Sequence, residues 1–387
     1  MGPHPAVAEV RLAVRRGLAD LPPGSLVLAA CSGGADSLCL AAALAWEAPR
    51  SGLRAGAVTV DHGLQPGSAE VARRAAAALR GLGLDPVAQV RAVVPGPAGQ
   101  GGPEAAARDA RYAALDQAAD QAGAAAVLLG HTRDDQAETV LLGLARGSGP
   151  RSLAGMPPRR GVFRRPLLGL RRPVMAEACA ALGLEPWQDP QNADAAYARA
   201  RVRHQALPAL AAALGPGVAE ALARTAAQLR ADAEVLDELA RAEAGRLREP
   251  GPAATESSGP GSSGPGSSGP GSSWPVPPLA ALPPAIRSRV LRLGAIEAGC
   301  PAGRLTAGHV GALDRLVTGW HGQRWADLPG GIRARRRYDK LLFIPPAGGS
   351  GAGVRGYPPG RRCVPPGGAA EAARPRLVLP EDASGRE

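Results

Sequence analysis

The chain has 387 residues, a net charge of +11 and a hydrophobic fraction of 45%. This length exceeds one ordinary domain and suits two, and the apolar fraction allows a sizeable buried core. Its only lysine, Lys340, lies in a Tyr-Asp-Lys-Leu segment. That context excludes a Walker A loop, because such a loop needs a Gly-Lys-Ser/Thr sequence.

The positive charge is carried almost wholly by arginine. Its planar guanidinium matches phosphate, so a nucleic-acid partner is one interpretation and a generally basic proteome is the other. The five cysteines form no C-x-x-C pair, which argues against a zinc knuckle, an iron–sulfur site or a disulfide framework. The N-terminus has no apolar signal core, and no stretch reaches the roughly 18 apolar residues that a membrane span needs. We therefore expect a cytoplasmic protein.

Strand-like and helix-like segments alternate between about residues 24 and 170. We expect strands at 25–30, 56–60, 86–94 and 124–130, and helices at 38–47, 104–121 and 134–146. This alternation predicts right-handed crossovers and a doubly wound α/β fold, with a parallel sheet covered on both faces. Ligands of such sheets bind beyond the carboxyl ends of the strands, where the richest motifs of this chain occur.

The second half of the chain is organised differently. It is expected to contain helices at 173–182, 207–247, 285–298 and 307–316, and one strand at 335–343. A Ser/Gly/Pro repeat beginning at Ser257 cannot bury a core and predicts a flexible spacer. We divide the chain into a first domain, a helical connecting region, a disordered linker, a small C-terminal domain and a disordered tail. The predicted boundaries are 1–205, 206–250, 251–273, 274–346 and 347–387.

The strongest motif lies between the first strand and its helix. It comprises Ser32, Gly33, Gly34, Ala35, Asp36 and Ser37. Its two glycines allow a tight turn that brings backbone N–H groups close to a phosphate, and the following helix directs its positive end to the same place. Asp36 cannot favour bare phosphate, so we expect it to bind Mg²⁺ or orient the loop. A tight turn with Ser/Asp capping is the alternative, but six such residues between a strand and a helix favour nucleotide binding.

Two further motifs follow the second and third strands. Asp61 and His62 could contact a nucleotide or a substrate, but Asp61 could equally cap the turn that Gly63 permits, so this motif alone leaves the choice open. Arg108 and Arg111 share a helix face suited to gripping phosphates. An ordinary surface ion pair between Glu104 and Arg108 is the alternative for that helix.

Three acids and a histidine follow the fourth strand, namely His131, Asp134, Asp135 and Glu138. Asp134 and Glu138 lie one helical turn apart, an arrangement that can bind a metal or a substrate ammonium. The alternative is an N-terminal capping box formed by Asp135 with Glu138. Capping does not account for all four groups beside the carboxyl edge of a sheet, which favours a functional site.

A basic segment ends the predicted first domain. Arg199, Arg201, Arg203 and His204 lie within six residues, next to Tyr197. Four cations beside an aromatic side chain predict a surface that contacts phosphate or RNA. A solvated start of a basic helix is the alternative.

Taken together, these segments resemble the tRNA(Ile)-lysidine synthetase family of PP-loop ATP pyrophosphatases. The resemblance covers about residues 24 to 245 and rests on SGGADS at 32–37, VDHGL at 60–64, EAAARDARY at 104–112, HTRDDQAETVLLGLARGSG at 131–149 and the segment from 189 to 204. Many PP-loop enzymes share the first motif, whereas the DDQAET and arginine-rich segments point to this family.

The resemblance implies that ATP adenylates the C2 oxygen of the wobble cytidine in a CAU-anticodon isoleucine tRNA, releasing pyrophosphate. The amine of free L-lysine then attacks C2 and expels AMP. ATP and Mg²⁺ are the implied cofactors, and a homodimer is left open. The implied catalytic residues are Asp36, which would also hold the metal, together with Asp134, Asp135, Glu138 and Arg108. The implied nucleotide contacts are residues 32–37, Asp61 and His62, and the implied lysine or tRNA contacts are His131, Arg111, Arg199, Arg201, Arg203 and His204.

Three features depart from the family pattern. Ala200 stands where the family usually has asparagine, and the Ser/Gly/Pro repeat is an insertion. The full second C-terminal domain of longer relatives is expected to be absent or shortened, so that tRNA recognition would rest on fewer elements. The competing interpretations are another PP-loop tRNA-modifying enzyme, such as a thiolase, and a tRNA-binding protein that has lost catalysis. The missing cysteine pairs argue against the first, and the intact loop and acids argue against the second.

Overall fold

The computed structural model describes residues 2–61, 63, 67–92, 102–147, 149–189, 194–248, 273–322 and 325–346, with the side chains of 102–105 excepted. These residues form two compact units. The first contains residues up to 146 and 152–227, and the second contains 147–151 and the described residues from 228 onward. The predicted repeat and tail lie outside the described residues, apart from Ser273.

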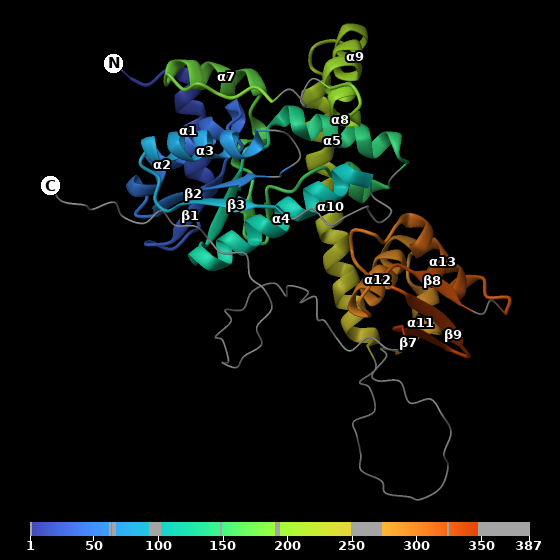
Figure 1. Ribbon diagram of the computed structural model, residues 1–387. Coiled ribbons are helices and arrows are strands. Elements are labelled where there is room, and N and C mark those ends of the chain that lie inside the picture. The colour runs from blue at the N-terminus through green and yellow to red at the C-terminus, as the bar shows by residue number, and fades with distance from the viewer. Residues whose placement is uncertain are drawn as a thin grey trace, which may run out of the picture. The chain divides into compact units, whose positions relative to one another are not determined.

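A six-stranded sheet forms the centre of the first unit (Figure 1). Its strand order is β3-β2-β1-β4-β6-β5. The strands are β1 (Leu26–Ala30), β2 (Arg54–Asp61), β3 (Val87–Arg91), β4 (Ala126–Leu129), β5 (Arg159–Arg160) and β6 (Phe163–Arg164). All neighbouring pairs are parallel except β5 with β6. The predicted doubly wound α/β fold is therefore confirmed, with an added antiparallel edge.

Helices cover both faces of this sheet because the central strand is apolar on both sides. Val27 and Ala29 of β1 belong to one buried cluster, and Leu26, Leu28 and Ala30 to the other. The first cluster includes residues of α1 (Pro5–Leu18), α2 (Ala35–Arg50), α3 (Ser68–Gly81) and α7 (Arg172–Ala181). The second is closed by Leu115, Ala118 and Ala119 of α4 (Gly102–Ala122).

The helix α1 has no counterpart among the predicted elements. The His4 side chain caps its first turn, and its buried positions Ala6, Val7, Val10, Val14 and Leu18 follow helical spacing. The other described helical segments up to residue 247 are short, except the last, and the residues of α6 are divided between the two units. They are α5 (Arg133–Ala145), α6 (Pro150–Leu153), η1 (Pro166–Gly169), α8 (Ala198–Arg201), a π-helical turn (Val202–Ala206), α9 (Leu207–Leu214) and α10 (Val218–Leu247), which continues into the second unit.

The second unit contains a four-stranded antiparallel sheet in the order β7-β10-β9-β8. Its elements are β7 (Ser273–Pro275), α11 (Val276–Ala281), α12 (Pro284–Glu297), α13 (Ala307–Thr318), β8 (Ala326–Leu328), β9 (Ile332–Arg337) and β10 (Lys340–Ile344). The single strand predicted at 335–343 is wrong. Tyr338 adopts a positive φ of 55° and turns the chain back, so this segment forms parts of two paired strands.

No single helix in the described ranges has both the length and the apolar character needed to cross a membrane. The bent pair Ala198–Leu214 and Val218–Leu247 meets the test only by length and composition.

Candidate active site

The loop between β1 and α2 forms a compact turn around Ser37. Its hydroxyl accepts a hydrogen bond from the Ser32 N–H (3.1 Å) and donates one to the Gly34 carbonyl (3.0 Å). Gly33 has a φ of +86°, a conformation that glycine adopts without strain. Gly34 is the N-cap of α2 and provides no side-chain acceptor. The first N–H groups of α2 are therefore available to an anion, as a phosphate-binding turn requires.

The end of β4 packs directly beneath this turn. A Cβ atom on Gly130 would lie 3.1 Å from the carbonyl carbon and oxygen of Asp36 and from the Cα of Ser37. Because those neighbours are backbone atoms, they cannot move aside as a flexible side chain would. Gly130 thus fixes the height of the first turn of α2 above the sheet.

Asp36 is the acid of this turn, and one of its oxygens lacks a partner. Its Oδ1 is buried and makes no hydrogen bond, while Oδ2 lies 3.5 Å from Arg172 Nε. Burial raises the pKa of Asp36 to about 6, against the opposing effect of Arg172. An unpartnered carboxylate oxygen at a phosphate-binding turn fits one ligand position of Mg²⁺, which commonly takes one or two protein carboxylates and completes its shell with phosphate and water. The described residues contain no group of three or more metal-binding side chains.

The helix α5 begins at a capping box that differs from the predicted one. Thr132 is the N-cap and Asp135 is its partner: the Thr132 N–H donates to Asp135 Oδ2 (2.7 Å) and the Asp135 N–H donates to Thr132 Oγ1 (3.4 Å). The predicted box of Asp135 with Glu138 is therefore wrong. The reason is positional, because the helix begins three residues earlier than that box requires, which leaves Glu138 without a capping role.

Glu138 is fully buried, with 0% of its surface exposed, and it is surrounded by guanidinium groups. Arg203 Nε donates to Oε1 (2.7 Å), Arg199 Nε donates to Oε2 (3.0 Å), and Arg172 Nη1 lies 3.4 Å from Oε1. A buried carboxylate is costly unless it is paired in this way. The sequence placed Arg199 and Arg203 at an RNA-contacting surface, whereas in this structure both side chains turn inward onto α5.

Asp135 belongs to the same cluster, since Arg172 Nη2 donates to its Oδ1 (2.8 Å). Burial opposes its ionisation, but Arg172 and the Thr132 N–H outweigh that effect and lower the pKa of Asp135. Asp134 accepts a hydrogen bond from the Arg172 backbone N–H (2.8 Å). The three predicted acids of α5 thus meet at Arg172, a residue that the sequence analysis did not single out.

The other two cations of the basic segment, Arg201 and His204, are exposed. Arg201 Nη1 donates to the carbonyls of Ala195 and Ala196, at 2.7 and 2.9 Å. The structure therefore divides the predicted basic cluster into two inward and two outward side chains. Ala200, which lies between Arg199 and Arg201 in the sequence, is buried. The asparagine that the family usually has at this position would need more space than alanine does.

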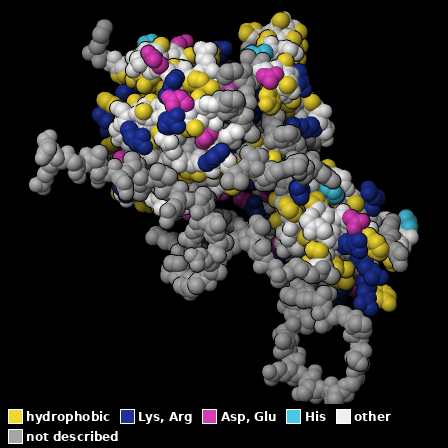
Figure 2. Space-filling view, in the orientation of Figure 1, with side chains coloured by type: hydrophobic (Ala, Val, Ile, Leu, Met, Phe, Trp, Pro, Cys, Tyr) yellow, Lys and Arg dark blue, Asp and Glu magenta, His cyan; other side chains and the backbone are white. Residues whose placement is uncertain are grey.

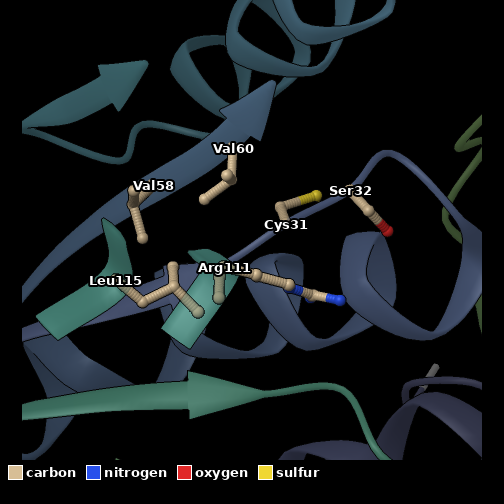
Figure 3. A pocket seen from close by; sticks show the side chains of 7 residues that line it. Cys31, Ser32, Val58, Val60, Arg111 and Leu115 are labelled. Atoms are coloured by element: carbon tan, nitrogen blue, oxygen red, sulfur yellow. The ribbon is translucent and has the colours of Figure 1, made fainter. Parts of the chain in front are cut away.

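The two arginines of α4 also have different surroundings. Arg111 lines a small pocket with Ala30, Cys31, Ser32, Val58, Val60 and Leu115, at the carboxyl ends of β1 and β2 (Figure 3). Its guanidinium points along the pocket toward Ser32 (Figure 3). Arg108 is exposed and lies 5.4 Å from the ring centroid of Tyr112. Arg111 is thus the arginine adjacent to the phosphate-binding turn, and the Glu104 side chain lies outside the described residues.

Besides His204, two histidines were predicted to contribute to the site. His131 has a buried Nδ1 without a hydrogen-bond partner, and burial lowers its pKa to about 3, so its imidazole is neutral at physiological pH. His62 lies outside the described residues. Its neighbour Asp61 accepts a hydrogen bond from the Gly63 N–H (2.9 Å), as the turn-capping alternative predicted.

Trp187 is a second residue that the sequence analysis did not single out. Its N–H donates a 2.9 Å hydrogen bond to the Gly33 carbonyl, and its side chain is 36% exposed. The signal available in the sequence was an isolated aromatic residue close to Asp189 in a chain with an aromatic fraction of only 3%.

The parallel sheet, the glycine turn and the open N-terminus of α2 define a PP-loop nucleotide-binding domain. In agreement, residues 10–210 match the family description "PP-loop domain". Residues 275–342, in the second unit, match the description "TilS substrate binding domain".

Similar proteins extend over nearly the whole chain. The tRNA(Ile)-lysidine synthase of Thermobifida fusca is 59% identical and the match covers 88% of this chain and 98% of that protein. The proteins of the same name from Streptomyces coelicolor and Salinispora tropica are each 53% identical, covering 89% and 88% of this chain and 99% and 97% of theirs. The chain belongs to the tRNA(Ile)-lysidine synthase family, which confirms the predicted family and disfavours the thiolase alternative.

Proposed function

We propose that this protein uses ATP and Mg²⁺ to adenylate the C2 oxygen of the wobble cytidine in an isoleucine tRNA with a CAU anticodon, and then joins free L-lysine to C2. The observation that carries this proposal is that the phosphate-binding turn, the nucleotide half of the site, is connected to the acids of α5, the amine half. The phosphate-binding turn presents Asp36, and Arg172 joins Asp36 to the acids of α5.

The first half supports adenylation. The open N–H groups at the start of α2 would bind the phosphates of ATP, and Arg111 lies in the neighbouring pocket. Asp36 Oδ1 would hold Mg²⁺, which when bound would neutralise the charge on the departing pyrophosphate. Adenylation converts the C2 oxygen of a pyrimidine, a poor leaving group, into part of a phosphate ester that departs as AMP.

The second half supports capture of an amine. Four carboxylates, from Asp36, Asp134, Asp135 and Glu138, contact or adjoin three guanidinium groups, from Arg172, Arg199 and Arg203. Among these acids, Asp134 accepts a hydrogen bond from the Arg172 backbone N–H, and the described residues give it no ion pair to a guanidinium group. Its negative charge would be the one available to an ammonium group such as that of lysine. The neutral imidazole of His131 adds no repulsion against an incoming cation.

The second unit offers a surface for the tRNA body. In β9, Ile332 and Ala334 are buried, whereas Arg333, Arg335 and Arg337 project from the other face of the strand. Figure 2 shows basic side chains gathered over this strand. Trp320 and Trp325 are partly exposed nearby, with Arg336 and Arg333 at 5.2 and 4.8 Å from their ring centroids. Arginines with exposed aromatic rings are suited to phosphate contact and base stacking.

The test is a reaction of the purified protein with unmodified CAU-anticodon isoleucine tRNA, ATP, Mg²⁺ and radiolabelled lysine. We expect labelled RNA and one pyrophosphate for each lysine incorporated. The same tRNA with a changed wobble base serves as the control and should remain unlabelled. Incorporation of labelled sulfur instead of lysine would contradict the proposal and restore the thiolase alternative.

A further inference from the structure

Arg172 occupies the junction between the nucleotide half and the amine half of the site. It is the first residue of α7, and its backbone N–H donates to Asp134 Oδ2 (2.8 Å). Its guanidinium reaches two elements: Nε lies 3.5 Å from Asp36 Oδ2 on α2, and Nη2 lies 2.8 Å from Asp135 Oδ1 on α5. Nη1 and Nη2 each lie 3.4 Å from Glu138 Oε1.

Building on the function proposed above, we infer that Arg172 is a positioning residue that couples the two chemical steps, by holding Asp36 and the acids of α5 at a fixed separation. Adenylation takes place at the turn that carries Asp36, whereas the amine is expected at α5. The amine can reach C2 before water does only if these two sites keep their relative position.

The other arginines of the cluster cannot replace it. In the described residues, Arg199 contacts Glu138 and Thr139, and Arg203 contacts Glu138 and Asp135. All these partners belong to α5. Arg172 is the residue for which the structure gives ion pairs both to α5 and to Asp36.

The chemistry of the guanidinium suits this role. A planar fork with several fixed N–H donors can address carboxylates in different directions, whereas an ammonium group is a single point of charge. Without a cation at this position, four carboxylates would face only two guanidinium groups. The resulting repulsion would push Asp36 and α5 apart, and burial would make each unpaired charge more costly.

The experiment compares Arg172→Gln and Arg172→Lys with Arg171→Gln, which removes the exposed neighbouring arginine at the N-cap of α7. For each protein, pyrophosphate release and lysine incorporation are measured on CAU-anticodon tRNA, together with the lysine KM and the melting temperature. The ratio of lysine incorporated to pyrophosphate released reports the coupling. When water attacks in place of the amine, AMP leaves and cytidine is regenerated, so ATP is consumed without lysidine.

We expect Arg172→Gln to lower this ratio well below one, because Asp36 and the acids of α5 are no longer held at a fixed separation. The lysine KM should rise by roughly tenfold, because the acids that would bind the ammonium are displaced, an effect that outweighs the removal of one positive charge. Arg172→Lys should fall between this variant and the wild type, and Arg171→Gln should match the wild type. A ratio near one with an unchanged lysine KM in Arg172→Gln would overturn the inference. So would an equal loss of both steps with a lowered melting temperature in both Arg172 variants, which indicates a structural role. Failure of the wild type to form lysidine would instead overturn the proposed function itself.

Discussion

The backbone N–H of Trp187 donates a 2.9 Å hydrogen bond to the carbonyl of Gly33, within the phosphate-binding turn. The two residues also pack together, since a Cβ atom on Gly33 would lie 3.7 Å from Trp187 Cβ. The segment before α8 is therefore hydrogen-bonded to the phosphate-binding turn. The partly exposed indole of Trp187 lies beside the site proposed for the triphosphate of ATP.

This contact leads to a fluorescence prediction. Binding of ATP beside the indole should change the emission of Trp187, because the ring is exposed to solvent in the free protein. We expect Trp187→Phe to lose the change that ATP causes, whereas Trp46→Phe, at the far end of α2, should keep it. Titration of both variants with ATP and Mg²⁺ measures this. An undiminished signal in Trp187→Phe would separate this residue from the nucleotide site.

A second prediction concerns the packing beneath the turn. Gly130→Ala should weaken ATP binding, because the added Cβ meets the backbone of Asp36 and Ser37 at 3.1 Å and lifts the first turn of α2. We expect the ATP KM for pyrophosphate release to rise about tenfold, which corresponds to about 1.4 kcal/mol. Gly81→Ala is the control, since a Cβ there meets nothing within 4 Å. Equal KM values in the two variants would contradict this account.

A third prediction follows from the pKa of Asp36, which burial raises from 3.8 to about 6. Between these values the folded protein retains a proton that the unfolded chain releases, so the contribution of Asp36 to stability falls as pH rises through this window. We expect Asp36→Asn to melt at a higher temperature than the wild type at pH 7.5 without Mg²⁺. The difference should disappear near pH 4, and pyrophosphate release should be lost.

Melting curves from pH 4 to 8 provide the measurement. A stability gain that persists at low pH would show that the effect of the substitution is unrelated to the ionisation of this carboxyl group.

A fourth prediction tests the arginine row of β9. Arg335→Ala should weaken tRNA binding and reduce the slope of log affinity against log salt by roughly 0.7 to 0.9, the effect of one lost phosphate contact. Arg304→Ala removes an exposed arginine of the same unit outside this strand and should leave the slope unchanged. Filter binding between low and moderate salt distinguishes the two. A wild-type slope in Arg335→Ala would exclude this side chain from the phosphate-contacting surface.

Much of the fold could be predicted because its signals are local. The strand at Leu26–Ala30 is apolar throughout, and the glycine turn follows it directly, so both could be located without knowledge of tertiary contacts. Tyr338 shows the limit of this approach. It lies in a basic stretch without glycine or proline, and nothing in that stretch signals the positive φ that separates β9 from β10.

The candidate site was predicted less completely than the fold. Asp36 and the acids of α5 lie in recognisable motifs. Arg172, in contrast, lies 34 residues beyond Glu138 in the sequence, and directly follows Arg171, from which no local pattern distinguishes it. Only folding brings α7 against α5. The inward orientation of Arg199 and Arg203 is likewise a tertiary property, because it depends on a fully buried carboxylate that requires partners.

The helix α1 supports α2 and α7, the two helices that contain Asp36 and Arg172. It packs against both α2 and α7, and Arg15 forms a two-pronged contact with Glu47 of α2, with distances of 2.8 and 3.1 Å. Removal of these first residues would open an apolar surface under both helices to water and leave the Glu47 carboxylate without its cation. Lysidine formation is thus expected to depend on a segment that contributes no residue to the candidate site, and shortened versions of the chain should lose it because α2 and α7 are less firmly held.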